Sequence, residues 1–145
     1  MRDRLSTGSR MAQWDIGVNT SCSFCQDPLE SIEHLFFQCS FTSLIWENLA
    51  REVLKDSFTA RWSEIKRIVV DENQGRLFLF TIRYLFQTSV HYIWRERNRR
   101  RHGEQGSSHC LLTKLIEKTV RNKLYIIQGR DKKYEGGLQF WFGTR

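Results

Sequence analysis

The sequence has 145 residues, of which 40% are hydrophobic and 27% are charged, and its formal net charge is +7. The length favours one domain; no apolar run reaches the roughly 18 residues of a membrane-spanning helix, and the opening MRDRLSTGSR lacks the apolar segment of a secretory signal. We therefore expect an intracellular protein without disulfides. Residues 61–145 carry a net charge of +10, whereas residues 1–60 carry −3. The basic charge of the second part indicates an anionic partner such as nucleic acid.

The first twenty residues are polar and are interrupted by two glycines. We expect three apolar side chains, Met11, Trp14 and Ile16, to pack this segment onto the rest of the chain.

The segment CSFCQDPLESIEHLFFQC contains a metal-ligand pattern, C-x2-C-x8-H-x4-C. Thiolate sulfur and imidazole nitrogen bind Zn²⁺ tetrahedrally, and C-x2-C is a tight turn that places two sulfurs near two corners. The pattern predicts one zinc ion held by Cys22, Cys25, His34 and Cys39. Because four protein ligands leave no position for water, the zinc is expected to be structural and not catalytic. The alternative is a turn with two unpaired thiols, followed by a buried Cys39 that packs as a small apolar side chain.

A helical pattern follows directly, at residues 41–54, with Ser40 as the expected N-cap. Its apolar stripe consists of Ile45, Trp46, Leu49 and Val53. Cys39 would lie just before this helix, where the helix dipole stabilises a thiolate. His34 is expected to begin a short extended piece.

Residues 62–70 and 76–101 are predicted to be helices, separated by the loop DENQG. The second helix ends in WRERNRRRHG, with Gly103 as its stop. Its arginines are candidate phosphate ligands, because the guanidinium fork matches phosphate geometry: Arg95, Arg97, Arg99, Arg100 and Arg101. The alternative is a basic helix end that only faces solvent. His91, in the middle of this helix, is expected to be a core or boundary residue.

Residues 109–128 form the last predicted helix, whose apolar face consists of Leu112, Ile116, Val120, Leu124 and Ile127. Lys114, Lys118 and Arg121 repeat on another face and are further candidate nucleic-acid contacts, although such a stripe can also be an ordinary solvated face. Cys110 is expected to be an ordinary thiol of the helix surface and not a metal ligand. In the tail, the rings of Phe140 and Trp141 are expected to pack and not to stack on bases.

Several short motifs of the first third occur together in a characteristic order. They are Arg10–Met11, Trp14 with Ile16, the two cysteines of C-x2-C, Glu30–Ser31, HLFFQC at residues 34–39 and Ile45–Trp46. In this the sequence resembles the reverse-transcriptase zinc-binding domain of plant LINE-type (non-LTR) retrotransposons. IWRERNRRRHG at residues 93–103 and KKYEGGLQFWF at residues 132–142 resemble the C-terminal part of the same polyproteins.

The resemblance implies a non-catalytic appendage that binds RNA or DNA without specificity beside a polymerase domain. It also implies that the protein is nuclear and that it binds neither a small-molecule substrate nor a membrane. The aspartates are scattered singly and do not form the paired metal site of a polymerase, so we expect no enzyme. The family domain usually begins before the Arg-Leu that here is Arg4–Leu5, so the chain looks truncated at its N-terminus. The alternative is a protein-interaction module or an inert remnant without specific nucleic-acid binding, whose truncated surface could self-associate.

These patterns predict a mainly α fold with a small zinc-stapled N-terminal lobe built on a short hairpin or knuckle. We expect residues 1–56 to be the truncated zinc-binding domain and residues 57–145 to be a basic helical region packed on it.

Overall fold

The structure is a computed structural model that describes residues 5–145, and within that range it contains helices and no strand. In chain order the elements are α1 (Gly8–Met11), the π-helix η1 (His34–Gln38), α2 (Ser40–Leu54), the 3-10 helix η2 (Lys55–Ser57), α3 (Trp62–Val70), α4 (Arg76–Arg101), α5 (His109–Arg130), the 3-10 helix η3 (Lys132–Tyr134) and α6 (Gly137–Gly143). The mainly α fold is confirmed. The predicted truncation falls on residues 1–4, outside the described residues, and the domain boundary at residue 56 stays a prediction.

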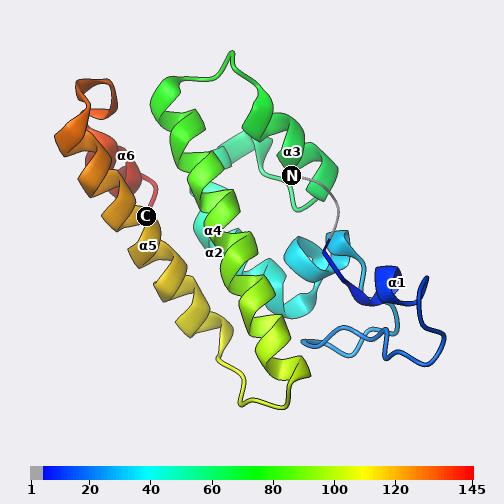
Figure 1. Ribbon diagram of the computed structural model, residues 1–145. Helices are drawn as coiled ribbons and strands as arrows, with labels where there is room; N and C mark the ends of the chain where they lie inside the picture. Colours follow the sequence, from blue (N-terminus) through cyan, green and yellow to red (C-terminus); the bar gives the residue numbers. More distant parts are fainter. Residues whose placement is uncertain (1–4) are drawn as a thin grey trace.

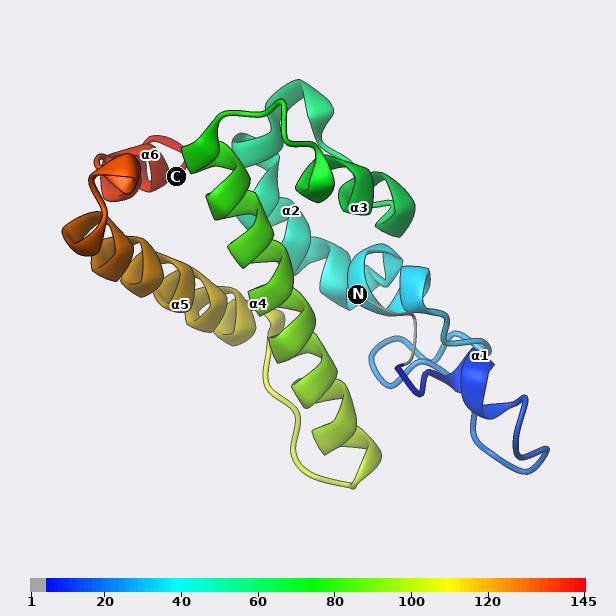
Figure 2. The same ribbon diagram turned by 45° about the horizontal axis from the view of Figure 1, so that its top comes forward.

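Helix α4 runs through the middle of the molecule, with α5 on one side and α3 on the other (Figures 1 and 2). Helix α2 packs against both α4 and α5, and α6 folds back onto α5. Residues 5–39, which contain α1, the loops around it and η1, form an N-terminal lobe that lies beside the C-terminal half of α4 (Figure 1). None of the helices in the described range combines the length and the apolar character needed to cross a membrane.

An aromatic cluster joins the lobe to the helices. The ring centroid of Phe37 lies 4.5 Å from that of Trp46 on α2, 5.9 Å from that of Trp62 on α3 and 5.9 Å from that of Phe86 on α4. Phe36 stacks on Trp62 at 5.2 Å. Full burial of each such side chain contributes about 1.5–3 kcal/mol, so the lobe and the helices form one core.

The long helices begin and end close to the predicted residues. The apolar repeat of 41–54 becomes α2, which starts one residue early because Cys39, and not Ser40, is its N-cap. Helix α5 continues to Arg130, two residues beyond the prediction, and the Ser108 side chain caps it by accepting a hydrogen bond from the Leu111 amide. Gly103 ends α4 with a φ of +79°, a left-handed conformation that glycine adopts at little cost.

Two predictions about the lobe were wrong. Trp14 and Ile16 do not pack: Trp14 is 63% exposed and Ile16 is fully exposed. The segment after His34 is a π-helix and not an extended piece, because the Cys39 amide donates to the His34 carbonyl oxygen across 2.7 Å and closes a single wide turn. His91 was also misplaced, since it lies on the exposed face of α4.

Candidate metal centre

The first two sulfurs are positioned by a tight turn. The Cys22 amide donates to the Asp27 carbonyl oxygen across 2.8 Å, and the Gln26 amide donates back to the Cys22 carbonyl oxygen across 3.0 Å. Gln26 has a φ of +65°, which lets the chain reverse directly after Cys25. This closed loop turns both thiols toward the same point.

The other two ligand atoms come from one turn of π-helix. In a π-helix the residues i and i+5 lie one turn apart. Residues His34 and Cys39 have this spacing, and the hydrogen bond between their backbones holds them on the same side of η1. Leu35, Phe36 and Phe37 lie between the two ligands in the chain and are fully buried in the core, so core packing fixes the position of this turn. The spacing H-x4-C therefore has a direct structural cause.

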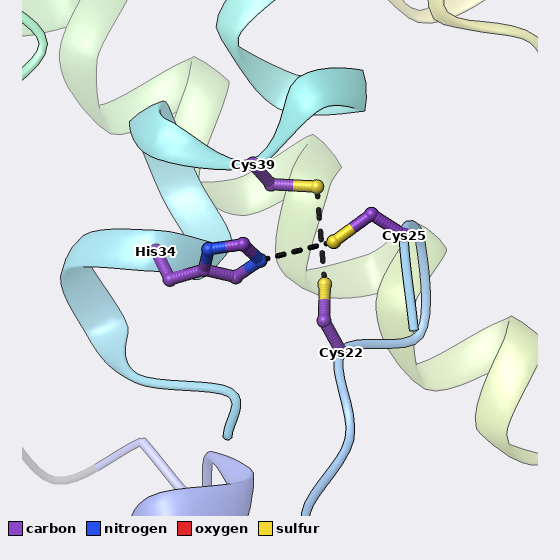
Figure 3. Close-up of side chains that lie close together, drawn as sticks. All are labelled: Cys22, Cys25, His34 and Cys39. Atoms are coloured by element: carbon purple, nitrogen blue, oxygen red, sulfur yellow. Dashed lines mark hydrogen bonds between the residues drawn. The ribbon is translucent and has the colours of Figure 1, made fainter. Parts of the chain in front are cut away.

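The four side chains converge on one point (Figure 3). Their ligand atoms all lie within 4.8 Å of one another. The sulfurs of Cys22 and Cys39 are 3.8 Å apart, and the Cys25 sulfur is 3.2 Å from Nε2 of His34. A tetrahedral zinc with Zn–S distances of about 2.3 Å places two sulfurs about 3.8 Å apart, which matches the observed pair. The cluster is suited to one zinc ion with a closed coordination sphere.

The environment favours the thiolate form of Cys39. The hydrogen bond from Cys22 and the backbone amides of Phe41 and Thr42, at the start of α2, lower the pKa of the Cys39 thiol. The same bond to Cys39 and then burial raise the pKa of the Cys22 thiol. Cys39 is the N-cap of a 15-residue helix, the position directly before the helix that the sequence predicted, where the helix dipole also stabilises a thiolate.

This arrangement occurs in a segment that a comparison with known families also picks out. Residues 1–46 match the family "zinc-binding in reverse transcriptase". The matched range includes all four clustered side chains and ends at Trp46 in α2, so α3 to α6 lie outside it. No curated protein and no solved structure matched the chain.

A buried ion pair connects the lobe to α4. Glu30 is fully buried, and its carboxylate accepts hydrogen bonds from the Gly8 amide at 3.1 Å and from Nη2 of Arg97 at 2.6 Å. The Arg97 side chain is 5% exposed, donates a further bond to the Ser6 carbonyl oxygen and lies over the ring of Trp94. Sequence reasoning assigned Arg97 to nucleic acid and gave Glu30 no role. The segment around Glu30 also contains Asp27 and Glu33, so nothing in the sequence distinguishes Glu30 as the carboxylate that is buried.

The neighbouring arginines also contact the lobe. The guanidinium of Arg100 lies 4.9 Å from the ring centroid of Phe24, inside the C-x2-C turn, and 4.7 Å from that of Phe41. It also donates to Glu96 and to the Ser107 carbonyl oxygen. Arg101 donates to the carbonyl oxygen of Asn19 across 2.8 Å.

The remaining candidate contacts divide into paired and unpaired cations. Arg99 bonds to Glu96 and Glu104, whereas Arg95 is exposed. Lys114 and Lys118 are exposed and Arg121 is partly exposed on α5, and none of these three forms an ion pair within residues 5–145. The structure thus separates the arginines of α4 that hold the lobe from the cations of α5 that face outward. Cys110 is exposed beside His109 and lies outside the metal cluster.

Gly8 allows the lobe to close, and we expect Gly8→Ala to destabilise it by about 1–3 kcal/mol. An added Cβ would lie 2.2 Å from the Thr20 carbonyl oxygen, which is held in place by a 2.8 Å bond from the Glu30 amide. Urea unfolding measures the change. Gly129→Ala is the control: it meets nothing within 4 Å on helix α5 and should raise the stability by about 0.5 kcal/mol through helix propensity. Equal stability of Gly8→Ala and wild type would mean that the lobe is not closed in this way.

Proposed function

We propose that this chain is a nucleic-acid-binding module whose zinc is structural, similar to the C-terminal part of a plant LINE-type reverse transcriptase without its polymerase domain. It acts in the nucleus on RNA or DNA without sequence specificity and catalyses no reaction. Four protein ligands close the zinc site, which argues for a structural metal. Within residues 5–145 this cluster is the one group of three or more His, Cys, Asp or Glu side chains placed to hold a metal.

The basic outer face of α5 carries this proposal. Lys114, Lys118 and Arg121 repeat at i, i+4 and i+7, so they lie in one row on the helix. Residues 109–133 carry seven Lys or Arg against Glu117 and Asp131. Unpaired cations in a row attract a polyanion because binding releases the counterions condensed on its phosphates.

The arginine run of α4 has a different role in this proposal. Arg97 and Arg100 are bound to lobe or linker groups, and Arg101 donates to Asn19. A phosphate that bound them would have to displace contacts that hold the lobe. We therefore leave Arg97 out of the binding surface and assign Arg100 and Arg101 mainly to positioning of the lobe, with Arg95 as an accessible neighbour of α5.

The test is the affinity for labelled RNA, single-stranded DNA and duplex DNA at several salt concentrations. Replacing Lys114, Lys118 and Arg121 by alanine should weaken binding to every sequence alike. The log–log salt slope should become flatter by about two to three units, since each lost phosphate contact removes about 0.7–0.9 of a unit.

A charge-matched control is available away from α5. Arg61 is the N-cap of α3, Arg67 lies on α3 and Arg76 is the first residue of α4. All three are exposed, and their replacement by alanine removes the same charge. This control variant should keep the wild-type slope to within about half a unit. An unchanged slope in the α5 variant, or equal changes in both variants, would contradict a binding face on α5.

The exposed apolar side chains of the lobe favour a second candidate, a protein-interaction module. Trp14, Ile16 and Leu29 are exposed residues of the lobe, and exposed large apolar side chains can take part in a protein interface. Concentration-dependent self-association in the absence of any salt-dependent binding to nucleic acid would support this candidate over the first.

A further inference from the structure

The outer face of α5 contains an aromatic ring in line with its cations. Tyr125 follows Lys114, Lys118 and Arg121 at i+11, so helical periodicity places all four side chains in one row. The Tyr125 side chain is 66% exposed. It forms no hydrogen bond or ring contact with any residue in the described range, so the fold itself makes no use of this ring.

Apolar side chains border the same row. Leu111, Leu115 and Ile126 are exposed, although each is large enough to be buried in a core. A face that combines cations, one ring and aliphatic surface matches a ligand that offers phosphates and flat apolar surfaces together. Single-stranded nucleic acid is such a ligand, because its unpaired bases are free to stack on side chains.

We propose that α5 binds single-stranded RNA or DNA, with a base stacked on Tyr125 and the adjoining phosphates paired to Lys118 and Arg121. This inference rests on the proposed function and narrows its ligand to single strands. A duplex keeps its bases stacked on each other, so it would meet the cations with its phosphates and leave Tyr125 and the aliphatic border without a partner.

The dimensions of the helix permit these contacts. At about 1.5 Å per residue, Lys118 and Arg121 start about 4.5 Å apart along the axis, and Tyr125 lies about 6 Å beyond Arg121. The long cationic side chains can therefore reach successive phosphates while the base attached to one of them reaches the ring. Arg95 lines the same shallow hollow as Leu115, which places one more accessible cation at the edge of this face.

The experiment compares Tyr125→Ala and Tyr125→Phe for binding to a 15-nucleotide single strand and to the corresponding duplex. Tyr125→Ala should lower the single-strand affinity roughly 5- to 150-fold, the range measured for loss of one base–aromatic stack, at every salt concentration. Tyr125→Phe should bind like wild type because it keeps the ring. Neither variant should change duplex binding or the salt slope. Phe142→Ala removes a ring on α6 that is 54% exposed, so it is the matched control and should change none of these values.

Three results would overturn the inference. If Tyr125→Ala keeps the wild-type affinity while the triple α5 variant loses salt dependence, α5 contacts phosphates only, and the proposed function stands without this refinement. Tighter binding of the duplex than of the single strand, with Tyr125→Ala affecting both, would assign α5 to a duplex groove. Absence of salt-dependent binding to any nucleic acid would remove both this inference and the proposed function.

Discussion

Protein purified without added metal will contain one zinc ion per chain, and removal of that zinc by a chelator will unfold the N-terminal lobe. Residues 22–39 form one turn and one π-helix around four ligand atoms, with no strand in the lobe to hold them. The free energy of zinc binding in such a site, about 10 kcal/mol or more, is therefore folding free energy. Elemental analysis and amide hydrogen exchange measure the two effects.

Exchange should accelerate most for the lobe amides that are bonded within the turn and to Thr20, which include those of Cys22, Gln26 and Glu30. The amides of the paired helices α4 and α5 should be affected less, because their mutual contacts do not involve the metal.

Cysteine variants give the matched comparison. Cys25→Ser should lose the metal and reproduce the effect of the chelator. Cys110→Ser changes an exposed thiol outside the cluster, so it should keep full zinc content and wild-type exchange. Less than about a tenth of an equivalent of zinc, together with exchange that the chelator leaves unchanged, would contradict a structural metal site.

The second large effect is expected at the buried ion pair, where Glu30→Gln should cost about 3–5 kcal/mol of unfolding free energy. The substitution keeps the shape of the side chain and removes its charge. Arg97 would then be a buried cation without a counter-ion, and desolvation of that charge would no longer be offset. Urea unfolding at a fixed zinc concentration measures the change.

An exposed pair on α2 is the control. Glu47 and Arg51 form an i,i+4 ion pair with both side chains about half exposed, so Glu47→Gln should change the stability by less than about 0.5 kcal/mol. A combined Glu30→Gln/Arg97→Met variant should be less destabilised than the sum of the single variants, because it leaves no unpaired buried charge. Equal small effects of Glu30→Gln and Glu47→Gln would mean that the pair does not hold the lobe on α4.

The helices could be predicted because their signal is local. Ile45, Leu49 and Val53 repeat at i+4, and the structure buries all three on one face of α2. The same holds for Ile116, Val120 and Leu124 on α5. The metal cluster could be predicted for a related reason. The spacing C-x2-C corresponds to one tight turn and the spacing H-x4-C to one π-helical turn, and both are local features of the sequence.

What the sequence did not reveal depends on partners far along the chain. In the sequence Arg97 resembles the arginines around it. Its structural role comes from its contact with Glu30, which lies 67 residues earlier in the chain. Arg100 is likewise explained by Phe24 and Phe41, which belong to the zinc turn and the start of α2. Trp14 was expected to be buried because of its residue type, whereas the loop that carries it extends into solvent. A charge or apolar pattern shows what a side chain can do and not which distant group it meets.

Covalent labelling of lysine and arginine side chains in the wild-type protein, with and without a bound single-stranded oligonucleotide, tests the location of the binding surface most directly. Lys114, Lys118 and Arg121 should be protected several-fold at saturation. Arg61 and Arg67 on the α3 side, and the lobe-bound Arg97, should label equally in both samples. Saturating binding that leaves the α5 cations unprotected, or that protects the α3 side instead, would contradict the account.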